Sequence, residues 1–189
     1  QDAFAHAHAS FLKKTVHAGE AYGPESIFQA ITALHADRIG HGTYLLDASM
    51  IKDPAIQDPQ RYVKKLAQYI ADRRITLEIC LTSNMQTNPN LKRLEDHALV
   101  RMQEMRLSTT ICTDNRTVSN TTVSNELELA VKHLGFTAAD IKRCLVYGFK
   151  RSFFPGTYLE KRRYVRGIID YYEKLERENP ELAPHESQS

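Results

Sequence analysis

The sequence predicts an α/β fold built around a parallel sheet. Short apolar runs alternate four times with segments whose apolar residues recur at helical spacing. Such runs are typical of strands buried on both faces, which pair in parallel through right-handed helical crossovers. Polar residues follow each run, which predicts a site at the carboxyl ends of the strands, as in a doubly wound sheet or a (β/α)8 barrel.

The first part of the chain alternates regularly between helix and strand. Pro24 suits the first turn of a helix, and Gly42 closes a short strand. A helix opens at Asp58 or Pro59. The expected elements are helices over 2–12, 24–36 and from 58 or 59 onward, and strands over 14–17, 38–41 and 75–81.

The second part predicts one more strand and then a series of helices. Ser124 is a candidate helix cap, and Thr137 with Asp140 forms a variant of the capping box. Residues 153–156 break the chain before a final amphipathic helix. The expected elements are helical structure over 90–106, a strand over 107–112, a polar loop over 115–120, and helices over 124–134, from 137 onward, and over 157–177.

The length of 189 residues is that of one domain. A complete (β/α)8 barrel needs about 250 residues and eight strands. Four strands are visible here, so on length alone the chain would supply half a barrel. We therefore expect residues 1–178 to form half of a single barrel domain and residues 179–189 to be a flexible tail.

Composition excludes several classes of function. The net charge is +2, with acidic and basic residues interspersed and no basic stripe, so nucleic acid is not an expected partner. No apolar run approaches the roughly 18 residues of a membrane span, so a membrane is not expected either. The three cysteines (Cys80, Cys112 and Cys144) form no Cys-x-x-Cys pair and predict buried thiols in a reducing, cytoplasmic setting.

Chemically active side chains recur at the ends of the predicted strands. His17 and Glu20 follow the first strand, His41 the second, and Asp114 the last. Histidine and aspartate are suitable zinc ligands, but a catalytic zinc usually takes three protein ligands and a water molecule. A single histidine is more often structural than a ligand, so the argument depends on the agreement between strand ends.

The other histidines have simpler explanations. His6 and His8 lie in the first predicted helix, where side chains two residues apart point in different directions. They are expected at a solvated helix end. His35, His97 and His133 are expected on helix surfaces.

Four motifs together resemble the adenosine deaminase family. They are Thr-Val-His-Ala-Gly-Glu at 15–20, Arg-Ile-Gly-His-Gly at 38–42, Glu-Ile-Cys-Leu-Thr-Ser-Asn at 78–84, and Cys-Thr-Asp-Asn at 112–115. The resemblance runs from about Phe4 to Leu175. It implies a (β/α)8 barrel of the metal-dependent hydrolases, of which this chain supplies strands five to eight with their helices and the C-terminal helices.

The resemblance also implies roles for single residues. His17 and Asp114 would bind one Zn²⁺ per complete active site, which lowers the pKa of a bound water from about 15.7 toward 7. His41 would orient and deprotonate that water. Glu20 would protonate purine N1, so that hydroxide adds to C6 and ammonia leaves.

The resemblance further places two residues against the substrate. Gly19 and Asn115 would contact the purine nucleoside. Many family members have a second aspartate where this chain has Asn115, and an amide already carries the hydrogen that purine N7 accepts. Ser83 and Asn84 are candidates to orient the site from outside it, although a turn at a strand end explains them equally well.

The expected reaction is hydrolytic deamination of adenosine or deoxyadenosine to inosine or deoxyinosine. The alternatives are a related deaminase of adenine or of a modified adenine nucleoside or nucleotide, and a barrel fragment without catalytic activity. The first two metal ligands of the family form a His-x-His on a strand that this chain lacks. We therefore expect the N-terminal half of the barrel as a partner, and we expect this chain alone not to be an active folded enzyme.

Overall fold

The structure is a computed structural model, which describes residues 1–180. Its centre is a four-stranded parallel sheet in the order β1-β2-β3-β4. The strands are β1 (Thr15–Ala18), β2 (Arg38–His41), β3 (Thr76–Ile79) and β4 (Thr109–Ile111). Val16, Ile39, Leu77 and Thr109 pair in one continuous row across the sheet. The parallel pairing predicted from the buried runs is therefore confirmed.

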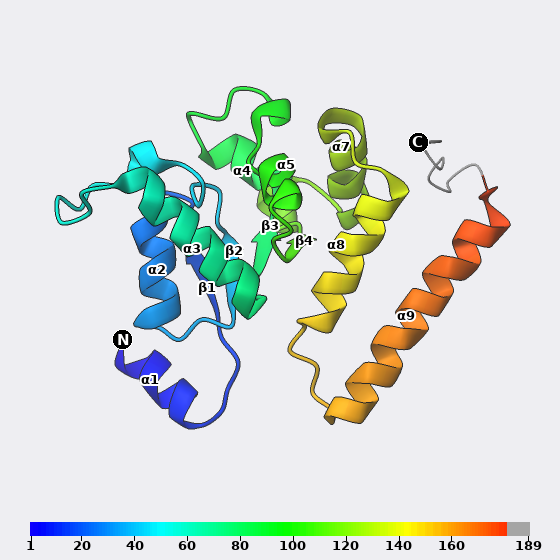
Figure 1. The fold of residues 1–189 in the computed structure, drawn as a ribbon. Helices are drawn as coiled ribbons and strands as arrows, with labels where there is room; N and C mark the ends of the chain where they lie inside the picture. Colours follow the sequence, from blue (N-terminus) through cyan, green and yellow to red (C-terminus); the bar gives the residue numbers. More distant parts are fainter. Residues whose placement is uncertain (181–189) are drawn as a thin grey trace.

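Helices follow each strand and then continue to the end of the described chain. They are α1 (Asp2–Ala9), α2 (Pro24–Thr32), α3 (Pro59–Arg73), α4 (Leu81–Thr87), α5 (Leu99–Glu104), α6 (Arg116–Ser119), α7 (Val123–Leu134), α8 (Ala138–Lys150) and α9 (Tyr158–Glu178), with short 3-10 turns at Ala48–Met50 and Leu94–Asp96. Figure 1 shows α2 and α3 beside β1 and β2, and the long α9 alongside α8.

The core lies between the sheet and the helices. Ile39, Leu77 and Ile79 of the central strands are completely buried. Ile27 of α2 and Ile70 of α3 are completely buried in the same cluster. Burying side chains of this size contributes about 1.5–3 kcal/mol each. This packing holds the sheet in place, and the sheet in turn fixes the positions of the side chains at the ends of its strands.

Several expected elements differ from the observed ones. The helical structure expected over 90–106 is a 3-10 turn followed by the short α5, and the polar loop expected over 115–120 contains α6. The strand expected over 75–81 ends at Ile79, and Leu81 begins α4. Thr122, and not Ser124, caps α7 by accepting a hydrogen bond from Asn125 N–H. Of the tail expected over 179–189, residues 181–189 lie outside the described residues.

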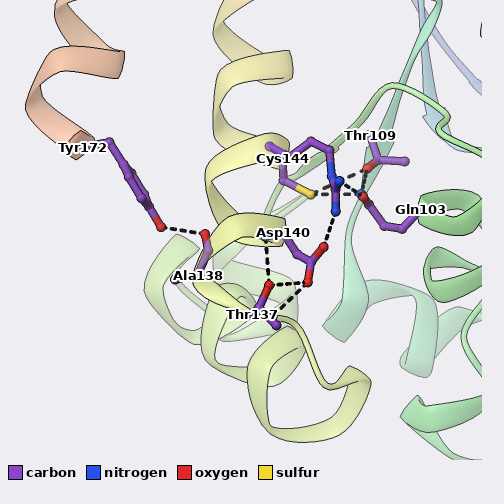
Figure 2. A network of polar contacts seen from close by, with 8 residues as sticks. Gln103, Thr109, Thr137, Ala138, Asp140, Cys144 and Tyr172 are labelled. Atoms are coloured by element: carbon purple, nitrogen blue, oxygen red, sulfur yellow. Dashed lines mark hydrogen bonds and ion pairs between the residues drawn. The ribbon is translucent and has the colours of Figure 1, made fainter. Parts of the chain in front are cut away.

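The capping box predicted at Thr137 and Asp140 is confirmed at the start of α8. Figure 2 shows this box and, one turn further along, Cys144 beside the Thr109 hydroxyl of β4. Figure 2 also shows Tyr172 of α9, whose hydroxyl donates to Ala138 O at 2.8 Å. The first contact attaches α8 to the edge strand β4, and the second attaches α9 to α8.

The three cysteines form no disulfide with one another. Cys80 and Cys144 are buried and Cys112 is half-buried, as expected for thiols used as small packing residues. Among the described helices, none has both the length and the apolar character needed to cross a bilayer.

A buried carboxylate connects α4 to the elements after β4. Glu126 of α7 is completely buried. It accepts hydrogen bonds from Thr82 N–H at 3.1 Å, from the Thr82 hydroxyl, and from the Thr121 hydroxyl at 2.7 Å. The first amides of a helix have no partner within the helix, and this carboxylate satisfies one of them. It thereby fixes the start of α4.

The replacement Glu126→Gln tests this connection. The amide nitrogen of glutamine would face a hydrogen-bond donor, so one buried donor loses its partner, and we expect the free energy of unfolding of the full-length protein to fall by about 1–3 kcal/mol. Denaturant unfolding measures the change. Glu128→Gln on the same helix is the matched control, because Glu128 is exposed and forms an exposed ion pair with Lys132. Equal stabilities for the two variants would contradict the role of Glu126.

Candidate active site

Three side chains converge at the carboxyl edge of the sheet. His17 lies in β1, His41 ends β2, and Asp114 follows β4. One ligand atom from each lies within 4.8 Å of the other two. The rings of His17 and His41 stack with their centroids 5.0 Å apart. The polar residues that follow separate strands in the sequence therefore lie close together in the structure. Among the described residues, these three form the only group of histidine, cysteine or acidic side chains that could hold a metal ion.

The backbone turns sharply where these side chains are placed. Gly19, His41 and Asp114 have φ values of 69°, 66° and 55°. This left-handed conformation is readily adopted by glycine but costs other residues roughly 1–3 kcal/mol. Strain of this kind persists where the surrounding structure imposes it, and it is concentrated at functional sites. The turns at His41 and Asp114 set the direction in which the chain leaves β2 and β4 at this edge.

His41 is the buried member of the cluster. Its side chain is 2% exposed, and its Nε2 lies 3.4 Å from a carboxylate oxygen of Glu20. Burial lowers the pKa of His41 below its usual value, although Glu20 and Asp114 act in the opposite direction. His41 is therefore neutral near pH 7. His41 and Glu20 thus place an imidazole beside a carboxylate, two groups suited to proton transfer.

Helix α4 brings two further side chains to the cluster. The Ser83 hydroxyl donates to Asp114 Oδ2 at 2.7 Å. Asn84 Nδ2 lies 3.0 Å from His41 Nδ1. Both residues are buried. Of the two explanations that the sequence left open for this pair, contact with the cluster is the one observed.

His97 is a member of this arrangement that the sequence did not indicate. The expectation of a position on a helix surface is wrong, because His97 precedes α5 and is only 2% exposed. Its Nε2 lies 3.1 Å from Asn84 Oδ1. Burial lowers its pKa to about 4. Asn84 and His97 are thirteen residues apart, a separation that no helix or strand period connects.

Asn115 caps α6 from the edge of the site. Its side-chain oxygen accepts hydrogen bonds from Thr117 N–H and Val118 N–H, both at 3.1 Å. Because the oxygen is held in this way, the amide hydrogens are the part of the side chain that can serve a bound molecule. This is the polarity that an acceptor such as purine N7 requires.

Gly19 is fixed by its own backbone. Its N–H donates to the Ser26 hydroxyl at 2.9 Å, and its carbonyl accepts from Tyr44 N–H at 2.8 Å. Contact of Gly19 with a substrate stays a prediction. The direct observation is that Gly19 anchors the turn between His17 and Glu20.

The remaining histidines lie away from the cluster. Figure 1 shows α1 leading into the start of β1, whereas the cluster lies at the strand ends. His8 of α1 stacks on His35 with ring centroids 4.1 Å apart. His133 is exposed, and its Nδ1 lies 2.9 Å from Glu95 Oε1. The expectation that His6 and His8 lie outside the metal cluster agrees with this arrangement.

Comparison with known proteins identifies the family of this chain. The model of a family described as adenosine deaminase matches residues 1–171. This chain belongs to the adenosine deaminase family. An adenosine deaminase from Mycobacterium sp. strain JLS is 36% identical over 154 residues, which are 82% of this chain and 41% of the relative.

Solved structures agree with the fold. An amidohydrolase from Burkholderia ambifaria with bound Zn matches with a TM-score of 0.76 and 24% identity, over 92% of this chain and 44% of that chain. The N6-mAMP deaminase of Arabidopsis matches with a TM-score of 0.66 and 27% identity, over 88% of this chain and 43% of that chain. The predicted partial (β/α)8 barrel is confirmed.

Both kinds of comparison agree on extent. The chain spans about two-fifths of the length of both the adenosine deaminase from Mycobacterium and the N6-mAMP deaminase from Arabidopsis. The family match begins at residue 1 and includes all four strands of the sheet. The cluster of His17, His41 and Asp114 accordingly lies within the matched region.

Replacing Gly19 by alanine tests the turn. A Cβ atom there would lie 2.5 Å from Ile27 Cδ1 and 3.1 Å from Gly42 Cα, in addition to the strain of the left-handed backbone. We expect a loss of about 2–4 kcal/mol in the free energy of unfolding of the full-length protein, measured with denaturant.

Gly135→Ala is the matched control. Gly135 has a φ of 67°, close to that of Gly19, but nothing lies within 4 Å of the point that a Cβ atom would occupy there. It should therefore lose only about 1 kcal/mol, which is the cost of the backbone conformation. If Gly19→Ala is no more destabilising than Gly135→Ala, close packing at the turn is not what requires glycine.

Proposed function

We propose that the protein to which this chain belongs catalyses zinc-dependent hydrolytic deamination of adenosine or deoxyadenosine. The products are inosine or deoxyinosine and ammonia. The observation that carries the proposal is the convergence of His17, His41 and Asp114, with Glu20 beside them, at the carboxyl edge of a sheet of the adenosine deaminase family. Catalytic groups of (β/α)8 barrels are found at this edge.

The donor atoms at this edge suit a zinc ion. His17 would provide a nitrogen and Asp114 an oxygen, and both are usual zinc ligands. The Ser83 hydrogen bond would hold the Asp114 carboxylate in one orientation. When bound, zinc supplies Lewis acidity and lowers the pKa of water. The zinc in the structure from Burkholderia ambifaria supports this choice of metal.

Two groups beside the metal ligands would act on the substrate. Glu20 would protonate purine N1, which makes C6 electrophilic. His41 would orient the attacking water with its Nε2, the ring nitrogen nearer to Glu20. The water oxygen would then form a bond to C6 as the bond from C6 to the exocyclic nitrogen breaks. One proton of the water would leave with that nitrogen as ammonia, and the other would restore the Glu20 carboxyl. Asn115 would donate to purine N7 through its amide, and Gly19 would line the same pocket.

The remaining ligands and most of the ribose pocket would come from the N-terminal half of the barrel. β1 and β4 have one neighbour each within the described sheet, so both edges are available for pairing with further strands. The protein would act in the cytoplasm, which three thiols without a disulfide support. This chain alone would not be an active enzyme.

The direct test follows the loss of adenosine absorbance and the release of ammonia by the full-length protein, before and after treatment with a chelator. Activity that disappears on chelation and returns with zinc supports the proposal. Deoxyadenosine, adenine and N6-methyl-AMP should be compared as substrates, because the Arabidopsis match is an N6-mAMP deaminase. Absence of turnover with both adenosine and deoxyadenosine would contradict the proposal, and turnover of adenine or N6-methyl-AMP alone would favour the related deaminases instead.

Replacing Glu20 by glutamine tests the proton donor. The amide cannot deliver a proton to N1, so we expect kcat to fall by about 10²–10⁴, with the metal content unchanged by elemental analysis. Glu104→Gln, at an exposed position at the end of α5, is the matched control and should keep full activity. Activity of Glu20→Gln close to wild type would exclude Glu20 as the proton donor.

Replacing Ser83 by alanine tests how the metal ligand is held. Loss of the hydrogen bond to Asp114 should weaken zinc affinity by about 10- to 100-fold, measured by competition with a chromophoric chelator. Ser124→Ala, at an exposed position in α7, is the control. If both variants bind zinc as tightly as wild type, the Ser83 contact plays no part in metal binding.

A further inference from the structure

Three side chains form one buried hydrogen-bonded row behind the site. Asn84 lies between His41 and His97, with its Nδ2 3.0 Å from His41 Nδ1 and its Oδ1 3.1 Å from His97 Nε2. Each of the three side chains is at most 2% exposed. Leu99 N–H closes the row by donating to His97 Nδ1 at 3.0 Å. Every polar atom that these side chains turn toward one another therefore has a partner.

The direction of every hydrogen bond in the row follows from its last member. A backbone N–H can only donate, so His97 Nδ1 is an acceptor and carries no proton. A neutral imidazole with a bare Nδ1 has its proton on Nε2. Burial lowers the pKa of His97 to about 4, so the neutral form is present at pH 7. His97 therefore donates through Nε2.

The orientation of the Asn84 amide is fixed in turn. Its oxygen must face the His97 Nε2–H, which leaves the amide nitrogen facing His41. The two ends of an asparagine amide are otherwise hard to tell apart, and the network around them decides the orientation. The opposite orientation would set two donors against each other at His97.

The same reasoning reaches His41. Its Nδ1 accepts from the Asn84 amide, so the neutral ring carries its proton on Nε2. Nε2 is the atom that lies 3.4 Å from the Glu20 carboxylate. The donor at Leu99 thus fixes the direction of each hydrogen bond in the row, and the last member, His41, directs its Nε2–H into the site.

We infer that Asn84 and His97 are positioning residues that hold His41 with its proton on Nε2, so that His41 meets the reacting atoms as a hydrogen-bond donor. The inference rests on the proposed function. It changes one role that the family resemblance implies, because a base must offer a lone pair at Nε2. In this site His41 orients the attacking water and stabilises negative charge on its oxygen. To accept a proton at Nε2, His41 would have to lose its hydrogen bond from Asn84.

Asn84→Asp reverses the polarity with almost no change of shape. A carboxylate only accepts, so His41 must place a proton on Nδ1 to keep the contact. We expect kcat for adenosine to fall by about 10- to 100-fold, with little change in KM. Asn120→Asp, at an exposed position at the end of α6, is the matched control and should keep full activity.

Two substitutions at His97 separate donation from packing. His97→Gln retains an N–H that can reach Asn84, whereas His97→Phe fills the space without a donor. His97→Phe should lower kcat, because both orientations of the Asn84 amide become allowed. His97→Gln should recover most of that loss. Equal loss in the two variants would show that His97 acts by packing alone and would overturn its assigned role.

Nitrogen-15 NMR of the full-length, metal-free protein gives a readout that does not depend on turnover. Wild type should show His41 and His97 protonated on Nε2 only, and Asn84→Asp should show a proton on His41 Nδ1. A wild-type His41 protonated on Nδ1 would overturn the inference. If wild type failed to deaminate any substrate, the proposed function would fall, whereas the NMR result would still decide the polarity of the row.

Discussion

Four parallel strands end at one edge of the sheet, and their register brings the side chains of the site to that edge. Val16, Ile39, Leu77 and Thr109 are paired in one row, so the residues that follow them lie at similar heights. A shift of one residue in any strand would turn its functional side chain to the opposite face. The completely buried side chains of the central strands fix the register, because such a shift would remove them from their packing against the helices.

Most of this arrangement could be predicted because its signals are local. An apolar run followed by a histidine or an aspartate marks a strand end within a few residues, and His17, His41 and Asp114 all follow this rule. The capping box at Thr137 spans only four residues. The family resemblance added roles, since spacing alone does not distinguish a metal ligand from a proton donor.

The features that could not be predicted depend on contacts between distant residues. Helix α4 begins directly after β3, and the Glu126 carboxylate that satisfies Thr82 N–H lies 44 residues further along the chain. No apolar periodicity around His97 marks it as buried, and its partner Asn84 lies in α4. A single sequence carries no local signal for either contact. Both belong to the support of the site and not to the strand ends themselves.

The position of Glu126 has a consequence for synthesis of the protein. A ribosome releases the chain from its N-terminus, so β1, β2, β3 and α4 emerge before the carboxylate that completes the start of α4. Until α7 has emerged, the first turn of α4 has water in place of this partner. The scaffold of the first three strands can form early, whereas the arrangement around His41 and Asp114 is completed only when the later helices are in place.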